Sequence, residues 1–477
     1  MRKIRLHLCI GVLGLCLAMA SCKVPAVMQA TENKTVPASF GSSGDTANTA
    51  AVPWRKFFTD PNLVSLIDTA LVRNQELNIT LQEIQTAKND VLFRQGPLRP
   101  YLAARLSTGI EKVGRFTSQG AGDASTEIKP GEEVPEILAD YVPSLYASWE
   151  VDIWKKLRNA KKAAITRYLS SIEGRNFVLT NLVSEVANSY YELLSLDAQL
   201  EIVRQSIGLQ KNALEIVKIQ KEAAKATELA VQKFQAEVLK SQSLEFDILQ
   251  NIQETENRIN FLLARFPQPI ARDRSNFLTL VPAAVSAGIP RQLLANRPDI
   301  KQAELDLAAA RLDVQVARAE FYPSLDISAA LGLQAFKPTY LLHLPESVLF
   351  SAAGDLAAPL INRNAIKAEF YTANARQLQA IYNYERSVLN AYLEVSTQLS
   401  KIDNVGKSYA LKSKQVDALT ESINIANDLF KSARADYFEV LMTQRDALES
   451  KLELVETKKE QLAAVVTVFR DLGGGWQ

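Results

Sequence analysis

Side chains that could do chemistry are scarce in this sequence. Its 477 residues include two histidines, His7 and His343, and three cysteines, which are Cys9, Cys16 and Cys22. A zinc site of the usual kind needs three or four such ligands, so loss of the N-terminus would leave too few. With 54 basic and 53 acidic residues the chain also lacks the positive field that gathers nucleic acid. We therefore expect no metal, no cofactor, no nucleic-acid partner and no enzymatic activity.

The N-terminus has the layout of an export signal. Three basic residues within the first five precede an apolar run over residues 6–20, which is shorter than the roughly 20 residues of a membrane span. The run ends in the sequence Leu17–Cys22, which resembles the lipobox of bacterial lipoproteins. That resemblance implies cleavage after Ser21 and acylation of Cys22. The alternative is an ordinary signal peptide cleaved nearby, which would leave a lone thiol near the start of the mature chain.

Two long windows of the chain are suited to very long helices. Residues 144–266 and 360–477 contain none of the 18 prolines, and proline is the residue that most disrupts a helix. Apolar residues recur there every seven positions, which indicates helices that supercoil about their neighbours. The first series is Leu179, Val186, Leu193, Leu200, Ile207 and Leu214, and the second is Ile381, Val388, Val395, Ile402, Tyr409, Val416, Ile423 and Phe430.

Each window is interrupted once, near residue 224 and near residue 433, so we expect two helical hairpins with their tips there. The first limbs, about 155–224 and 366–432, would each be roughly 100 Å long at the helical rise. The returning limb at about 226–266, together with a helix at about 299–321, would match the first limb in length.

Four segments before the hairpins alternate apolar and polar residues, at about 100–115, 140–153, 323–336 and 347–360. Period-two alternation predicts half-buried β-strands. Strands of this length that are apolar outward and polar inward are the unit of an outer-membrane barrel, although two hairpins on a soluble core remain an alternative. Four strands cannot close such a barrel, for which about eight is the usual minimum. Several chains must then contribute, and three would supply twelve strands.

The predicted fold class is therefore mainly α, with long α-helical coiled-coil hairpins and four strands that join a shared membrane β-barrel. The motif at Pro100–Leu102 returns at Pro323–Leu325, which indicates an internal duplication. We divide the chain into a signal peptide (1–21), a lipidated flexible tether (22–52), a first repeat (53–265), a connector at mid-height (266–298) and a second repeat (299–477).

Several motifs, taken in order, resemble the TolC-type outer-membrane efflux proteins, in the OprM- or NodT-like lipoprotein branch that serves resistance-nodulation-division pumps. They are Trp54 with Phe57–Leu63, Ser148–Trp154, Asn296–Ile300, Ala319–Leu325, Tyr437–Leu441 with Gln444 and Arg445, and Leu472–Trp476. The resemblance covers essentially the whole mature chain. It implies a homotrimer with a twelve-stranded barrel in the outer-membrane lipid, whose helical hairpins form a periplasmic α-barrel. It also implies that the trimer works with a periplasmic adaptor and an inner-membrane pump.

The resemblance also implies a gate where the second hairpin ends, formed by a ring of carboxylates. Glu439 occupies the first acidic position of that motif, Met442 stands where the family usually has Asp, and Arg445 keeps the basic partner. The gate would then have a single acidic ring. Alternatively, Glu439 and Asp436 have the spacing of a capping box that starts a helix, and Arg445 lies on a solvated face. Ala224 and Ala433 stand at the two tips, where Gly is common.

The leading functional hypothesis is a passive export duct with a gate at its periplasmic helix tips. A structural lipoprotein, a coiled-coil tether without a conduit, is the alternative, but amphipathic strands have no use in a tether. An enzyme is the third possibility, and its best carboxylates, Glu150, Asp326 and Asp355, lack a histidine or metal partner. The sequence does not identify the cargo or the pump.

Overall fold

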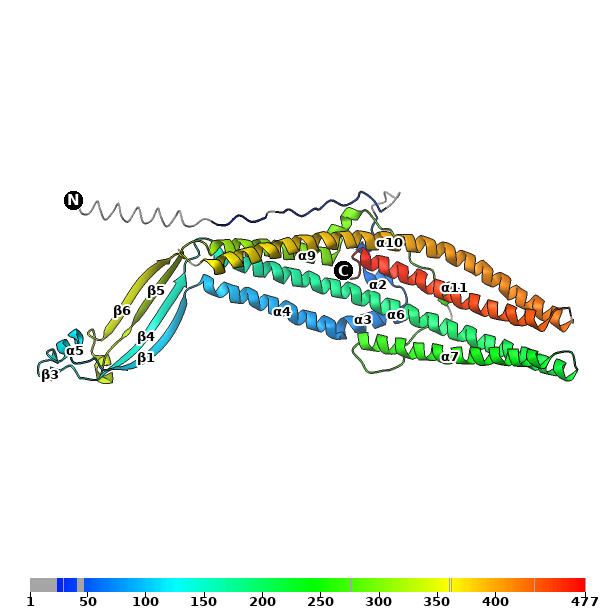
Figure 1. Ribbon diagram of the computed structural model, residues 1–477, viewed down its shortest axis with the longest axis horizontal. Coiled ribbons are helices and arrows are strands. Elements are labelled where there is room, and N and C mark those ends of the chain that lie inside the picture. Colours follow the sequence, from blue (N-terminus) through cyan, green and yellow to red (C-terminus); the bar gives the residue numbers. More distant parts are fainter. Residues whose placement is uncertain are drawn as a thin grey trace. The chain divides into compact units, whose positions relative to one another are not determined.

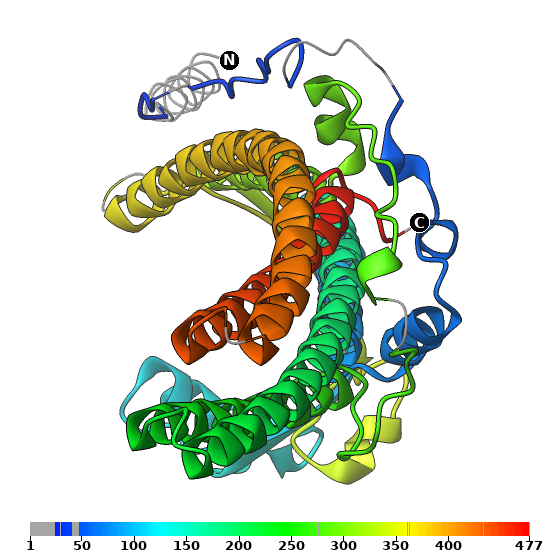
Figure 2. The ribbon, with the colours of Figure 1, turned by 90° about the vertical axis from the view of Figure 1, so that its right-hand side faces the viewer.

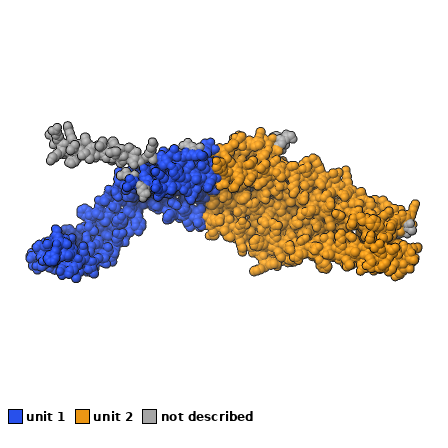
Figure 3. Space-filling view, viewed as in Figure 1, with its two compact units in different colours: residues 1–31, 85–168, 305–381 blue, residues 32–84, 169–304, 382–477 orange. Residues whose placement is uncertain are grey.

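The computed structural model describes residues 24–476, except residues 29, 41–46, 275, 276, 360, 362 and 433. The expected signal peptide, Cys22 and Ala433 therefore lie outside the described residues. The chain divides into two compact units (Figure 3). Unit 1 holds residues 85–168 and 305–381 with the N-terminal segment up to Thr31, and unit 2 holds residues 32–84, 169–304 and 382–477.

Unit 1 contains one antiparallel sheet of four strands in the order β1-β4-β5-β6 (Figure 1). The strands are β1 (Tyr101–Glu111), β4 (Leu138–Glu150), β5 (Ser324–Leu333) and β6 (Val348–Ala357). All four lie in the segments where alternation predicts strands, so four strands per chain are confirmed. The polar loop after β1 has structure of its own, because it holds α5 (Ser118–Asp123) and a small hairpin of β2 (Glu127–Lys129) and β3 (Glu132–Glu133).

Helices make up most of the rest of the chain. They are α2 (Trp54–Phe57), α3 (Pro61–Arg73), α4 (Gln75–Gln95), α6 (Lys156–Glu222), α7 (Glu228–Leu262), α8 (Leu293–Asn296), α9 (Pro298–Ala319), α10 (Asn364–Lys431) and α11 (Tyr437–Asp471). The two predicted long hairpins are thus present as α6–α7 and α10–α11, and Figure 2 shows the two helices of each hairpin side by side. In the described part of the chain, no helix is both long enough and apolar enough to pass through a bilayer.

The heptad residues of α6 form the core of unit 2. Val186 and Leu193 are completely buried, and Leu200, Ile207 and Leu214 are at most 8% exposed. They pack in three successive apolar clusters with residues of α7 and α11. The sustained spacing of seven residues therefore marks the helix face that packs.

The connector between α7 and α9 is tied to two distant parts of unit 2. At one point Asn48 pairs with Ala287, and the Thr49 amide donates to the Ser286 carbonyl at 2.9 Å. At the other, Arg297 joins the C-terminal motif. Its guanidinium donates twice to Asp299, at 2.7 and 3.0 Å, once to Glu394 at 2.8 Å and once to the Asp471 carbonyl at 2.9 Å.

The close approach of the chain at this point explains one glycine of the C-terminal motif. Gly473 has a φ of +90°, and a Cβ there would lie 2.6 Å from the Asn296 carbonyl oxygen. Two sequence motifs that lie 174 positions apart, around Arg297 and Asp471, thus form one buried contact.

Candidate functional site

One face of the four-stranded sheet is apolar and exposed. The register aligns Ala104 with Leu145, Leu145 with Leu331, and Leu331 with Phe350. Phe350 is 79% exposed, and Leu106 and Ile110 on β1 are 74% and 81% exposed. An apolar surface that continues across four strands marks a contact with lipid or with another protein. This is the face that the alternation predicts to point outward.

The opposite face of the sheet is polar. Here the register places Glu150 beside Asp326, and Asp326 beside Asp355, so three carboxylates follow one another across three strands. Glu150 pairs with Lys156 at 2.5 Å, and the Ser324 hydroxyl donates to Asp326 at 3.2 Å. Throughout residues 24–476 with the stated gaps, no group of three or more His, Cys, Asp or Glu side chains is arranged to hold a metal ion.

Both edges of the sheet are open within one chain. β1 pairs only with β4 and β6 only with β5 in the four-stranded order. An unpaired edge presents a row of backbone N–H and C=O groups that need partners. Such groups are especially costly in the hydrocarbon region of a bilayer, where water cannot satisfy them.

The tip of the first hairpin is formed by a C-terminal capping motif of α6 and an N-terminal cap of α7. Ala224 has a φ of +58°, and the amides of Ala224 and Lys225 donate to the carbonyls of Lys221 and Gln220. That pair of bonds is a Schellman motif, which usually has glycine at the left-handed position. Thr227 then caps α7, because its hydroxyl accepts from the Ala230 amide at 3.2 Å.

The second tip differs at the start of its returning helix. Asp436 is the N-cap residue of α11, but its side chain makes no capping hydrogen bond. The capping-box interpretation of Glu439 is therefore wrong. Glu439 is the acid in the first turn of α11.

The three candidate gate residues lie in the first three turns of α11. Glu439 is exposed, and no ion pair of its carboxylate is found among the residues that the structure describes. Met442 is half-buried, and Arg445 is exposed with its guanidinium 3.7 Å from the adjacent Asp446. Glu439 and Arg445 do not meet within one chain. Six positions apart on one helix, the two side chains lie on different faces.

A shared apolar cluster supports the two tips. Leu214 and Val217 of α6, Val231 and Phe234 of α7, and Val440 of α11 are buried in it. A cationic contact adds to it, because the Lys233 ammonium lies 5.3 Å from the centre of the Phe438 ring. Because Val440 is buried in the cluster, the backbone of the first turn of α11, which carries Glu439, is held in place.

Above this cluster, buried amides interrupt the apolar packing. Gln210 of α6 is fully buried, and neither its amide oxygen nor its amide nitrogen has a hydrogen-bond partner among the residues that the structure describes. Gln444 of α11 is 5% exposed, and its amide oxygen also lacks a partner. Gln210 lies three positions after the heptad residue Ile207, where the packed face calls for an apolar side chain, so the sequence could have indicated it. Nothing in the sequence distinguishes Gln444 as buried.

The comparison with known proteins agrees with this architecture. The sequence matches the outer membrane efflux protein family over residues 66–265 and 289–474. The chain therefore belongs to that family. It is 29% identical over 425 residues to the pyoverdine export outer membrane protein OpmQ of Pseudomonas aeruginosa, covering 89% of this chain and 87% of that protein.

Other relatives extend the match to lipoproteins and to solved channels. The chain is 25% identical to the probable outer membrane lipoprotein SilC of Salmonella typhimurium, with 95% of this chain and 93% of that protein covered. It has the fold of the open-state MtrE outer membrane channel of Neisseria gonorrhoeae, with a TM-score of 0.82, 21% identity and coverage of 95% of this chain and 98% of that one. A crystal structure of CusC also gives a TM-score of 0.82, at 23% identity, with 94% of this chain and 99% of that chain covered.

These findings confirm the fold class and the leading functional hypothesis. The protein is an outer-membrane efflux protein, an exit duct of the kind used by tripartite pumps. Membership of this family also places it among transport conduits rather than enzymes. The exposed apolar face of the sheet is the physical feature that such a location requires.

Proposed function

We propose that the protein acts as a homotrimer whose twelve strands close one barrel in the outer-membrane lipid, while its helices prolong the bore through the periplasm. One observation carries this proposal. The four-stranded sheet has two open edges and one exposed apolar face. A single copy cannot satisfy those edges in lipid, whereas three copies supply enough strands to close the barrel.

The duct receives its cargo from an inner-membrane pump of the resistance-nodulation-division type through a periplasmic adaptor. It is anchored by a lipid on Cys22. The name of SilC as a lipoprotein and the small residues before Cys22 support the anchor. The names of other relatives refer to pyoverdine, solvents and cations. Because these cargoes share so little chemistry while the proteins share one fold, the choice of cargo belongs to the pump rather than to the duct.

The gate of this duct lies in the first turns of α11. Glu439 supplies its acidic ring, Met442 an apolar layer one turn along the helix, and Arg445 a basic partner for a neighbouring copy. The exposure of Glu439 and Arg445 supports this assignment, since neither is satisfied by a distant residue of its own chain among the residues described. Met442 gives no second carboxylate, so removal of one acid per chain should open the gate.

Single-channel recording tests the duct and the gate together. Purified protein in a planar bilayer should conduct ions in small, infrequent steps, and Glu439→Ala should raise the conductance severalfold. Glu449→Ala is the matched control, because Glu449 is an exposed acid on the same helix. A tether without a conduit would not conduct at all, even with Glu439→Ala. Equal conductance of the two variants would remove Glu439 from the gate and leave the duct intact.

A further inference from the structure

We infer that two buried glutamines, Gln210 of α6 and Gln444 of α11, lower the free energy needed to separate the first turns of α11 from α6 and α7. Together with Ser241 of α7 they form one polar layer between two apolar clusters. Their amides lack partners while the helices are packed, and water satisfies them once α11 moves. This inference rests on the proposed gate in α11, and the first experiment below does not depend on that gate.

The three polar residues lie at one level, because the same two apolar clusters enclose them on all three helices. Gln210, Ser241 and Gln444 are at most 5% exposed. One cluster is the one that supports the two tips, here called the tip cluster, and the second lies farther from the tips. The residues of the two clusters that flank the layer are Leu214 and Ile207 on α6, Val238 and Ile248 on α7, and Val440 and Leu448 on α11.

An ion pair gives the register of α6 against α11 independently. Lys459 of α11 pairs with Glu192 of α6 at 2.9 Å. Towards the tips, Gln444 is 15 residues from Lys459, and Gln210 is 18 residues from Glu192. At a rise of about 1.5 Å per residue, the two glutamines lie within roughly one helical turn of the same level. They can therefore share one layer.

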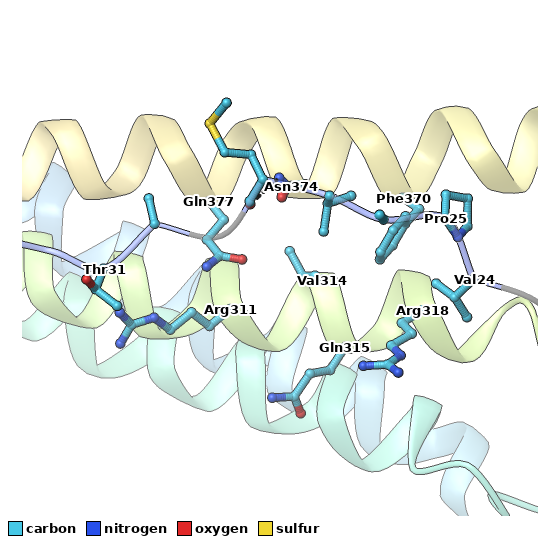
Figure 4. A pocket seen from close by; sticks show the side chains of 14 residues that line it. Val24, Pro25, Thr31, Arg311, Val314, Gln315, Arg318, Phe370, Asn374 and Gln377 are labelled. Carbon is cyan, nitrogen blue, oxygen red and sulfur yellow. Dashed lines mark hydrogen bonds between the residues drawn. The ribbon is translucent and has the colours of Figure 1, made fainter.

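A buried amide in unit 1 shows the usual arrangement. Asn374 of α10 is buried and lines a cavity of about 570 Å³ beside α9 and α10 (Figure 4). Its amide nitrogen donates to the Met28 carbonyl at 3.3 Å. In contrast, both ends of the Gln210 amide and the amide oxygen of Gln444 lack a partner among the residues described. Because nearly all buried polar groups in native proteins are hydrogen-bonded, this layer calls for an explanation.

The missing hydrogen bonds affect the equilibrium of α11 because water can replace them in one state and not in the other. A buried amide without a partner is costly, whereas an amide in contact with water keeps its hydrogen bonds. Separation of α11 at this level therefore relieves Gln210 and Gln444. A change that favours the separated state in this way shifts the equilibrium towards it by the difference in free energy.

The apolar contacts that oppose separation are few on the tip side of the layer. Among the described residues of α11, Val440 alone is buried in the tip cluster, with Tyr437 and Leu441 partly buried against it. On the other side, α11 supplies Leu448 to the second cluster, and it supplies further buried residues to the core, namely Val455, Leu462, Val466 and Phe469. The turns that carry Glu439 can thus leave while the rest of α11 stays packed.

Thiol labelling tests the layer without reference to Glu439. Val440→Cys places a thiol on the residue that must leave the tip cluster, and a charged maleimide should reach it when α11 has moved. The labelling is read on the peptide that contains residue 440. Addition of Gln210→Met/Gln444→Met should slow this labelling by about tenfold or more, which corresponds to about 1.4 kcal/mol. Gln205→Met/Gln250→Met, at two exposed glutamines, is the matched control and should leave the rate unchanged.

A second thiol separates local movement from overall stability. Leu448→Cys lies beyond the layer, so its labelling requires more extensive unfolding and should be slow with or without the glutamine substitutions. Equal slowing at residues 440 and 448 would mean that the substitutions merely stabilise the fold, and would overturn the inference. An unchanged rate at residue 440 would overturn it as well. Gln210→Met alone should act in the same direction, and it serves if the double variant does not fold.

Single-channel recording then connects the layer to the gate. In the Glu439→Ala protein, Gln210→Met/Gln444→Met should reduce the fraction of time spent at high conductance by about tenfold, while the control pair leaves it unchanged. If Glu439→Ala alone does not raise the conductance, the proposed gate is wrong, and the labelling result still decides on the layer. An unchanged fraction, in a channel that Glu439→Ala does open, would refute the effect of the layer on the gate.

Discussion

Replacement of Arg297 is the most direct test of how the second repeat is held together. Its side chain is 6% exposed and makes four hydrogen bonds, to Asp299, Glu394 and the Asp471 carbonyl. Breaking a buried ion pair from one side typically costs about 3–5 kcal/mol, because it leaves a buried charge without a partner. The Glu394 side chain is 44% exposed and water can replace part of its loss, so we take the lower end, about 3 kcal/mol.

Thermal unfolding of the purified protein, followed by circular dichroism, measures this cost. Arg297→Ala should lower the apparent Tm by about 5 °C or more, given the usual relation between unfolding free energy and Tm. The Tm of Arg297→Lys should lie between those of the wild type and Arg297→Ala, because lysine keeps the charge but cannot donate twice to Asp299 in the planar geometry of a guanidinium. Arg258→Ala is the control, since Arg258 forms an exposed pair with Glu185 and exposed pairs contribute little. If Arg297→Ala melts at the wild-type temperature, the contact between the two motifs does not stabilise the fold.

Three further substitutions follow from the structure. Ala224→Gly should raise the free energy of unfolding by about 0.5–1 kcal/mol, because it relieves an alanine at positive φ. Ala223→Gly, at the next position, is the control and should lower the free energy of unfolding. A loss of stability with Ala224→Gly would contradict the positive φ at the first tip. Gln210→Met should raise the Tm by removing a buried amide without partners, which costs about 1–3 kcal/mol; an unchanged Tm would mean that water satisfies the amide. Burial lowers the pKa of Lys458, whose ammonium lies 4.8 Å from the centre of the Tyr409 ring. The charged lysine therefore destabilises the fold at neutral pH. This cost shrinks as the pH rises toward the ordinary pKa of lysine, where the side chain is neutral in both the folded and the unfolded state. Lys458→Met should therefore be more stable than wild type near pH 7 and lose this advantage towards pH 10.5, and an advantage that is constant with pH would contradict the buried charge.

The regular elements could be predicted because their signals are local. Proline-free windows and the heptad residues Val186 and Leu193 indicate the long helices, and strict alternation around Leu106 and Phe350 indicates the strands. Each of these patterns depends on neighbours a few positions apart. The structure places the same residues on the packed faces of the helices and on the apolar face of the sheet.

The contacts that sequence reasoning missed join residues that are far apart in the chain. Asn374 meets Met28 across 346 positions, and Arg297 meets Asp471 across 174. The proposed gate is a third case, because one chain places Glu439 and Arg445 on an exposed surface, and in the proposed trimer their partners belong to another copy.

The unpaired edges of β1 and β6 have a consequence for biogenesis. A newly exported copy cannot enter the bilayer by itself without leaving two rows of backbone groups unsatisfied in hydrocarbon. Insertion must then coincide with association, which makes its rate depend steeply on how many copies are present at once. At low expression, association of the copies would be the slow step, and an exported, water-exposed monomer would accumulate before it. The open sheet of that monomer is vulnerable to aggregation, so it must be kept soluble until other copies are available.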